Sequence, residues 1–107
     1  MRITMTKQEE QFQKEILANC EMARQTCGTN PARFLKQVES YGALKAVQEL
    51  IRRRRVSDGF DRLQSAGRLD LSVEASVIRK EYAALFSDEE VNYCLDVLLE
   101  CGYFGYR

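Results

Sequence analysis

The sequence predicts an all-α fold, a single compact domain of about six helices joined by short loops. Two capping boxes, Thr6–Glu9 and Ser87–Glu90, mark helix starts. Apolar residues recur three or four positions apart along most of the chain, which is the spacing of one helix face. One proline and six glycines in 107 residues leave few turns for a fold built of many short strands. We therefore expect residues 1–107 to form one helical domain.

The first half of the chain predicts three helices. The first begins at the Thr6–Glu9 capping box and ends before Gly28, and its apolar stripe comprises Phe12, Ile16, Cys20, Ala23 and Cys27. The second is predicted to start at Asn30-Pro31, with the asparagine as cap and the proline at the first helical position, and to end at Gly42. The third runs from residue 43 into the arginines at 52–55.

The second half predicts three more helices around a connector. Ser57-Asp58 is expected to cap a short fourth helix that ends near Gly67. Residues 69–71 alternate apolar and polar, which predicts an extended connector with both leucines buried and Asp70 pointing outward or capping.

A fifth helix is expected to follow the connector, capped by Asp70 or Ser72, and residues 82–86 either continue it or break it. The last helix begins at the Ser87–Glu90 box and stops at Gly102. The aromatic tail at 103–107 is expected to fold back on the core.

The charge is unevenly distributed although the net charge is zero. Residues 31–68 carry nine basic and four acidic side chains, a net charge of +5, whereas residues 69–107 carry three basic and eight acidic ones, a net charge of −5. Such asymmetry bears on partners and on the steering of association. The positive part either binds a polyanion or is neutralised within the molecule by the acidic third.

The residue inventory argues against an enzyme. The chain has no histidine, so the commonest general base and the commonest metal ligand are missing. The glycine-rich phosphate-binding patterns and the G-x-S-x-G nucleophile elbow are also absent. We expect no cofactor. No apolar run is long enough to span a bilayer and the N-terminus has no signal-peptide core, so a cytoplasmic protein without membrane contact is predicted.

Four cysteines raise the question of a metal or disulfide site. Cys20 and Cys27 are seven residues apart, as are Cys94 and Cys101, and seven helical residues span about 10.5 Å. Neither pair can therefore share a zinc ion or form a disulfide within itself. We expect buried, reduced thiols, with Cys27 and Cys101 as the more exposed ones. A four-cysteine site formed by the first and last helices, or one reactive thiol, is the alternative.

The candidate binding residues are arginines. They comprise Arg52, Arg53, Arg54, Arg55, Arg62 and Arg68. One interpretation is a solvated helix C-terminus, where cations favour the negative end of the helix dipole. The other is a site for a polyanion or an acidic partner, to which Lys45 could also contribute. The run lacks interleaved aromatic residues, so no stacking platform for single-stranded nucleic acid is indicated.

One segment resembles a known sequence pattern. Gly59-Phe60-Asp61-Arg62-Leu63, followed by Gly67-Arg68-Leu69-Asp70-Leu71-Ser72-Val73-Glu74 and Val77, is similar to G-F-x-x-L…G-R-L-D-L-[ST]-x-E-x-x-V. That pattern occurs in a small uncharacterised bacterial helical domain, and Leu85–Glu90 resembles its continuation. The resemblance implies a bacterial or phage origin and a loose association with restriction, defence or mobile-element genes. It implies no catalytic residue.

Three hypotheses follow. The first is a small non-catalytic interaction protein, a regulator, inhibitor or adaptor that docks on a protein partner, because separate acidic and basic surfaces orient association. The second is direct DNA or RNA binding through Arg52–Arg55, Arg62 and Arg68. The third is a metal or redox function of the cysteines. The oligomeric state is open.

Overall fold

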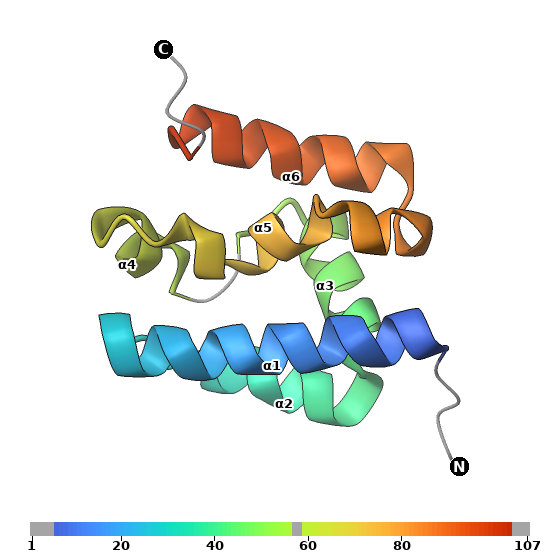
Figure 1. The fold of residues 1–107 in the computed structure, drawn as a ribbon, viewed down its shortest axis with the longest axis horizontal. Coiled ribbons are helices and arrows are strands. Elements are labelled where there is room, and N and C mark those ends of the chain that lie inside the picture. Colours follow the sequence, from blue (N-terminus) through green and yellow to red (C-terminus); the bar gives the residue numbers. More distant parts are fainter. Residues whose placement is uncertain (1–5, 57–58, 104–107) are drawn as a thin grey trace.

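A computed structural model of the protein describes residues 6–56 and 59–103. These residues form six α-helices and two short 3₁₀ helices, with no strand among them, so the predicted all-α class is confirmed. Figure 1 shows α2 and α6 at opposite edges of the molecule, with α1 and α5 between them. The elements, in chain order, are α1 (Lys7–Cys27), α2 (Ala32–Tyr41), α3 (Ala43–Arg52), α4 (Phe60–Ser65), η1 (Leu69–Leu71), α5 (Val73–Val77), η2 (Lys80–Leu85) and α6 (Asp88–Glu100).

Both predicted capping boxes are present. The Thr6 hydroxyl accepts a hydrogen bond from the Glu9 backbone N–H at 3.1 Å, and the Glu9 carboxylate accepts one from the Thr6 N–H at 3.0 Å. Ser87 and Glu90 make the same pair of contacts at the start of α6, at 3.2 and 2.8 Å. Each box satisfies two backbone donors that a helix start leaves unpaired. The predicted starts of the two longest helices are therefore confirmed.

Two predicted helix ends need correction. The N-cap residue of α2 is Pro31 and not the predicted Asn30, and the helix begins at Ala32. No side chain caps this helix start. The third helix ends at Arg52 and does not continue through the arginines. Arg54 adopts a positive φ of 55°, a conformation that ends a helix. The predicted cap at residues 57 and 58 lies outside the described residues, as does the tail beyond Tyr103.

The connector at residues 69–71 is a 3₁₀ turn, so the predicted extended segment is wrong. The N–H groups of Leu71 and Ser72 bond back to the carbonyls of Arg68 and Leu69, each at 3.0 Å. Leu69 is buried, but Leu71 is only half-buried, because successive side chains of a helical turn do not point to opposite sides. Ser72 caps α5 by accepting from the N–H of Ala75 at 3.1 Å, and residues 80–85 form the separate helix η2.

The core consists of two apolar clusters arranged along α1. In the larger one, Phe12 of α1 is fully buried and meets the rings of Tyr82 and Phe86 edge to face, at centroid distances of 5.1 and 5.3 Å. The smaller cluster joins α4 to α6 and includes Leu63 and Leu98. Edge-to-face packing of this kind adds to the stabilisation from burial itself. No helix among residues 6–56 and 59–103 is both long and apolar enough to cross a membrane.

The α2–α3 hairpin is tied to α1 by a side chain. The two helices are separated by Gly42 alone, whose φ of 88° favours glycine. The Gln13 amide oxygen of α1 accepts a hydrogen bond from the Ala43 N–H at 2.9 Å and so satisfies a backbone donor at the start of α3. This contact fixes the direction of α3, whose far end carries the arginines.

Candidate arginine-lined binding surface

The end of α3 divides its arginines between local partners. Arg52 and Arg53 both contact the Glu49 carboxylate one turn earlier, and the Arg53 Nε lies 2.7 Å from Glu49 Oε2. Hydrogen bonds from Arg52 and then from Arg53 lower the pKa of Glu49 below its ordinary value. Glu49 therefore stays ionised at neutral pH and offsets part of the positive charge of the run.

Arg54 faces the opposite direction, toward α6. Its guanidinium lies over the ring of Tyr93, 5.1 Å from the ring centroid. Such a cation–π contact contributes about 0.5–1 kcal/mol at an exposed site. Burial, followed by the charges of Glu74 and Cys94, raises the pKa of the Tyr93 hydroxyl, and Arg54 opposes this shift. Arg54 thus links the end of α3 to α6.

Arg62 and Arg68 occupy two further local settings. Arg68 makes a two-pronged contact with Asp70, in which Nε and Nη2 donate to the two carboxylate oxygens at 3.0 and 3.2 Å. Arg62, on α4, lies beside the end of α1. Its Nη1 is so close to Gly28 that a β-carbon added to this glycine would lie 3.5 Å from it. Neither residue is among those that line the two grooves beside α3.

The first of these grooves lies between α2 and the end of α3. Its volume is about 140 Å³. Three guanidinium groups border it, from Arg33, Arg53 and Arg55, together with Gln37 and the single carboxylate of Glu49. The lining also includes apolar side chains, which are Phe34, Leu50 and the exposed Val56.

Arg33 was missed by the sequence analysis. It stands alone at the start of α2, outside the run of arginines, and only the folding of α2 against α3 brings it beside Arg53 and Arg55. The one signal in the sequence was the short α2–α3 connection, which implies antiparallel neighbouring helices.

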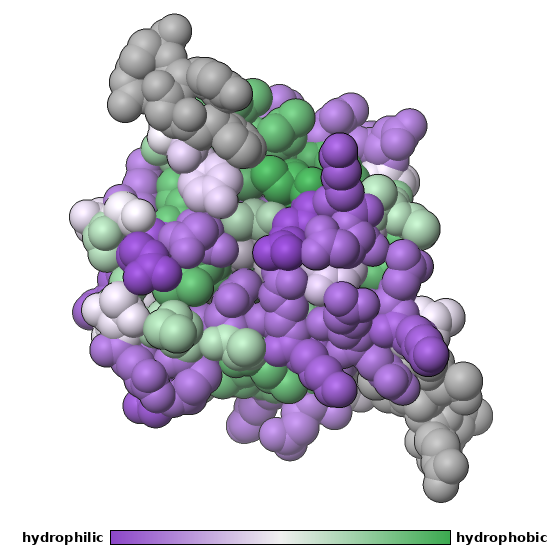
Figure 2. All heavy atoms as spheres, viewed as in Figure 1, coloured by the Kyte–Doolittle hydropathy of each residue, from purple (hydrophilic) through white to green (hydrophobic). Residues whose placement is uncertain are grey.

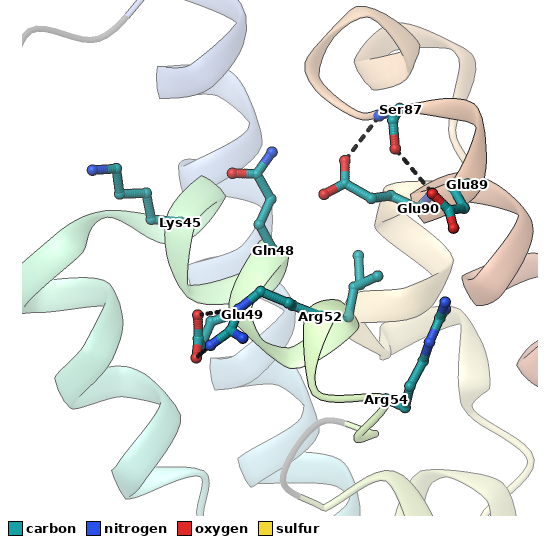
Figure 3. A pocket seen from close by; sticks show the side chains of 9 residues that line it. Lys45, Gln48, Glu49, Arg52, Arg54, Ser87, Glu89 and Glu90 are labelled. Atoms are coloured by element: carbon teal, nitrogen blue, oxygen red, sulfur yellow. Dashed lines mark hydrogen bonds and ion pairs between the residues drawn. The ribbon is translucent and has the colours of Figure 1, made fainter.

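The second groove separates α3 from the start of α6 and is larger, about 560 Å³. Figure 3 shows Lys45, Gln48 and Arg52 along α3, Arg54 just beyond its end, and Ser87, Glu89 and Glu90 across from them. Basic and acidic side chains thus face each other across this groove. The carboxylate that Arg52 contacts is Glu49 of its own helix, and Glu90 is used in the capping box of α6.

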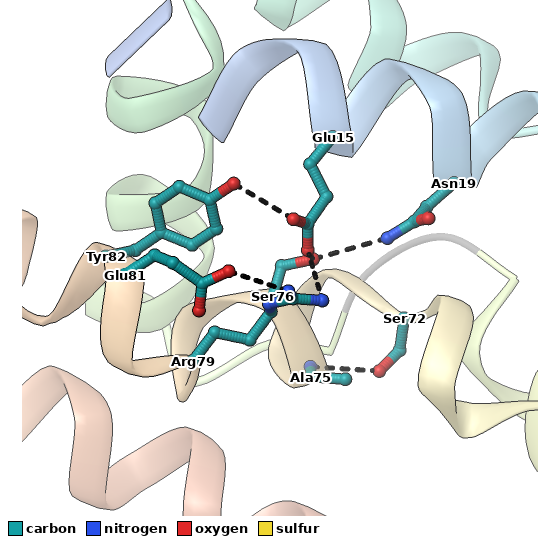
Figure 4. A network of polar contacts seen from close by, with 8 residues as sticks. All are labelled: Glu15, Asn19, Ser72, Ala75, Ser76, Arg79, Glu81 and Tyr82. Carbon is teal, nitrogen blue, oxygen red and sulfur yellow. Dashed lines mark hydrogen bonds and ion pairs between the residues drawn. The ribbon is translucent and has the colours of Figure 1, made fainter. Parts of the chain in front are cut away.

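A polar network lies between α1, α5 and η2 (Figure 4). The Glu15 carboxylate accepts hydrogen bonds from the hydroxyls of Tyr82 at 2.9 Å and Ser76 at 2.8 Å, and Arg79 lies 3.6 Å from it. The Asn19 amide donates to Ser76 at 3.3 Å. Because these groups satisfy one another, we assign the network to fastening α1 onto α5 and η2.

The cysteines form neither a disulfide nor a metal cluster in the described part of the chain. Cys94 is buried and the other three are half-buried, all as free thiols. No group of three metal-binding side chains occurs among residues 6–56 and 59–103. Burial raises the pKa of Cys20 to about 11 and, together with the charges of Glu74 and Glu90, that of Cys94 to about 12. Both thiols are therefore protonated and weakly nucleophilic at neutral pH.

Comparisons with protein families, with curated proteins and with solved structures find no match for this chain. The resemblance at residues 59–90 and its association with defence genes therefore stay predictions. Neither the fold nor any relative supplies a function, so the local chemistry of the surface is what indicates one.

Proposed function

We propose that this protein is a small non-catalytic interaction module that docks on a protein partner. The observation that carries the proposal is the groove between α2 and α3, which is lined by three arginines, Arg33, Arg53 and Arg55, and by apolar side chains. Guanidinium groups bind carboxylates through paired hydrogen bonds, and an apolar lining accommodates an apolar side chain. The complementary ligand is an acidic segment of a protein with one apolar residue at its centre.

Direct nucleic-acid binding through Arg52–Arg55, Arg62 and Arg68 is the second candidate. It is favoured by the clustering of Arg53 and Arg55 with the additional Arg33. Two observations favour a protein partner instead. Glu49 pairs with Arg52 and Arg53, and Asp70 pairs with Arg68, so three of the six arginines proposed to contact phosphate already have carboxylate partners. The docking proposal relies instead on the exposed Arg33 and Arg55 of the groove. An apolar lining also adds nothing to phosphate contacts, which rest on charge.

A charge-reversal variant tests the protein-docking proposal. Tagged parent protein is used to capture partners from a bacterial lysate, beside the double variant Arg33→Glu, Arg55→Glu. A second variant, Lys14→Glu with Lys80→Glu, reverses the same number of charges away from the groove and serves as the matched control. We expect a protein that is retained by the parent and the control but lost with the groove variant. Identical captured proteins for all three would contradict the proposal.

Gel shifts test the nucleic-acid alternative. Duplex DNA, single-stranded DNA and RNA are each mixed at low salt with the parent and with a variant in which Arg52–Arg55 are alanine. Phosphate contacts predict a shift that weakens steeply as salt is added and that the variant loses. No shift at low salt, or an equal shift with the variant, excludes this site.

The association with bacterial defence is a proposal that rests on the sequence resemblance alone. The cytoplasmic location is a proposal that rests on the composition of the chain.

A further inference from the structure

The groove between α2 and α3 calls for an acidic segment with an apolar anchor, and this chain carries one on its own surface. Leu99, near the end of α6, is 42% exposed although it is a large apolar residue. Asp96 and Glu100, three residues before it and one after, are also exposed. Positions three and four apart are neighbours on a helix surface, so Asp96 adjoins both Leu99 and Glu100. The three side chains form one patch, here termed the α6 patch.

Every charged side chain of α6 is acidic. The helix from Asp88 to Glu100 contains five carboxylates and no lysine or arginine. Figure 2 shows apolar side chains, with hydrophilic ones beside them, over the middle of the region that α6 occupies in Figure 1. The α6 patch combines an apolar side chain with carboxylates, and the groove combines apolar side chains with guanidinium groups. The two surfaces are therefore complementary in charge.

On one molecule the α2 side of the groove, which carries Arg33, lies away from α6 and its patch. The groove is bounded by α2 and the end of α3, and α2 and α6 lie at opposite edges of the fold (Figure 1). Two complementary surfaces that are separated on one chain can be joined only between chains. A net charge of zero at neutral pH removes the overall repulsion that keeps many proteins monomeric.

We propose that the groove between α2 and α3 binds the α6 patch of a second copy of this chain. Leu99 contacts the exposed Val56 and the accessible part of Leu50, while Asp96 and Glu100 pair with Arg33 and Arg55. Because the two surfaces differ, the contact is heterologous, and it extends from copy to copy unless the rotation between copies closes a ring. The inference rests on the proposed function, since it identifies the protein partner of the same groove.

The first experiment measures the mass of the parent protein in solution. Light scattering after size exclusion, and sedimentation at several concentrations, are expected to show association that increases with protein concentration and weakens when salt is added. A mass that stays at that of one chain up to roughly 1 mM at low salt would overturn the inference. Capture of another protein through the groove would then still support the proposed function, so the two can fail separately.

The second experiment exchanges charges across the contact. One variant carries Asp96→Lys and Glu100→Lys, and the other carries Arg33→Glu and Arg55→Glu. Each is expected to be monomeric alone, whereas an equal mixture is expected to associate. In the mixture the unchanged groove of the first variant meets the unchanged patch of the second, and the reversed patch complements the reversed groove. Native mass spectrometry identifies species that contain one copy of each variant.

Two controls protect this test. Circular dichroism of each variant shows that its helices are intact, which is expected because all four positions are exposed. Glu21→Lys with Glu39→Lys changes charge by the same amount elsewhere and is expected to associate like the parent. Association that survives either reversal, or a mixture that stays monomeric, would overturn the assignment of these two surfaces.

Discussion

Tyr82 shows how a single residue joins packing to ionisation. Its ring is 1% exposed within the larger cluster, yet its hydroxyl reaches the Glu15 carboxylate. Burial, and then the hydrogen bond to Glu15, raises the pKa of Tyr82 to about 12 from an ordinary value of 10.0. The folded protein therefore favours the neutral phenol more strongly than the unfolded chain does. The resulting stabilisation is fully present below pH 10 and is lost as the pH rises toward 12.

Replacing this phenol should change the alkaline behaviour of the protein. Tyr82→Phe loses one hydrogen bond, which costs about 1 kcal/mol at neutral pH. The variant no longer has a phenol to ionise, so its free energy of unfolding should fall less than that of the parent between pH 9 and pH 12. Urea unfolding across this range measures both curves. Tyr41→Phe, at a position that is 60% exposed, is the matched control, and parallel curves for parent and Tyr82→Phe would contradict the assignment.

Arg54 combines backbone strain with a favourable contact. Its φ of 55° lies in the left-handed region, which costs a residue other than glycine about 1–2 kcal/mol. Arg54→Ala keeps that strain and loses the contact with Tyr93, so it should lower the melting temperature. Arg54→Gly loses the same contact but relieves the strain, and it should melt above Arg54→Ala. Equal melting temperatures would show that residue 54 changes its backbone conformation when the arginine is removed.

At the scale of the elements, the turn at η1 distributes burial unequally between two leucines. Leu69 is 5% exposed within the smaller cluster, whereas Leu71 is half-buried. Leu69→Ala should cost about 2–5 kcal/mol, the range found for buried leucines. Leu71→Ala should cost clearly less because part of its surface already contacts water. Thermal melts of the two variants rank them, and a larger loss for Leu71→Ala would mean that the residues around η1 pack differently.

The sequence predicted those elements whose signals are local. A capping box acts over four residues, so Thr6–Glu9 and Ser87–Glu90 located α1 and α6 without any knowledge of the fold. The apolar–polar alternation at residues 69–71 predicted an extended segment, but three residues are too few to distinguish an extended segment from one helical turn. The backbone hydrogen bonds to the carbonyls of Arg68 and Leu69 show that the segment is a 3₁₀ turn.

The candidate surface was harder to predict than the helices. Its arginines were visible as a run, but Arg33 joins them only through the packing of α2 against α3. The contacts of the arginines at 52–55 were likewise predictable only where the partner is close in the sequence. Glu49 is one helical turn from Arg53 and could have been paired with it from spacing alone, whereas the contact between Arg54 and Tyr93 joins residues on different elements.

At the scale of the whole molecule, charge and core have different roles. The ion pairs of the described residues are mainly between exposed side chains, including Arg24–Glu21, Arg68–Asp70 and Arg79–Glu81. Pairs of this kind contribute about 0–1 kcal/mol each, and salt screens them. The fold is held instead by apolar burial around Phe12 and by part-buried hydrogen bonds such as those of Glu15, which salt screens less than exposed pairs.

This division predicts different responses of folding and association to salt. Raising the sodium chloride concentration should shift the melting temperature of a dilute, monomeric sample by no more than about 4 °C, the change that corresponds to roughly 1 kcal/mol in a domain of this size. The same increase should strongly reduce self-association, because Asp96, Glu100, Arg33 and Arg55 act from exposed positions. Calorimetry at low protein concentration and sedimentation at high concentration measure the two effects separately. A large fall in melting temperature with salt would show that the segregated charges hold the fold together, which would leave them engaged within one molecule rather than available to a second.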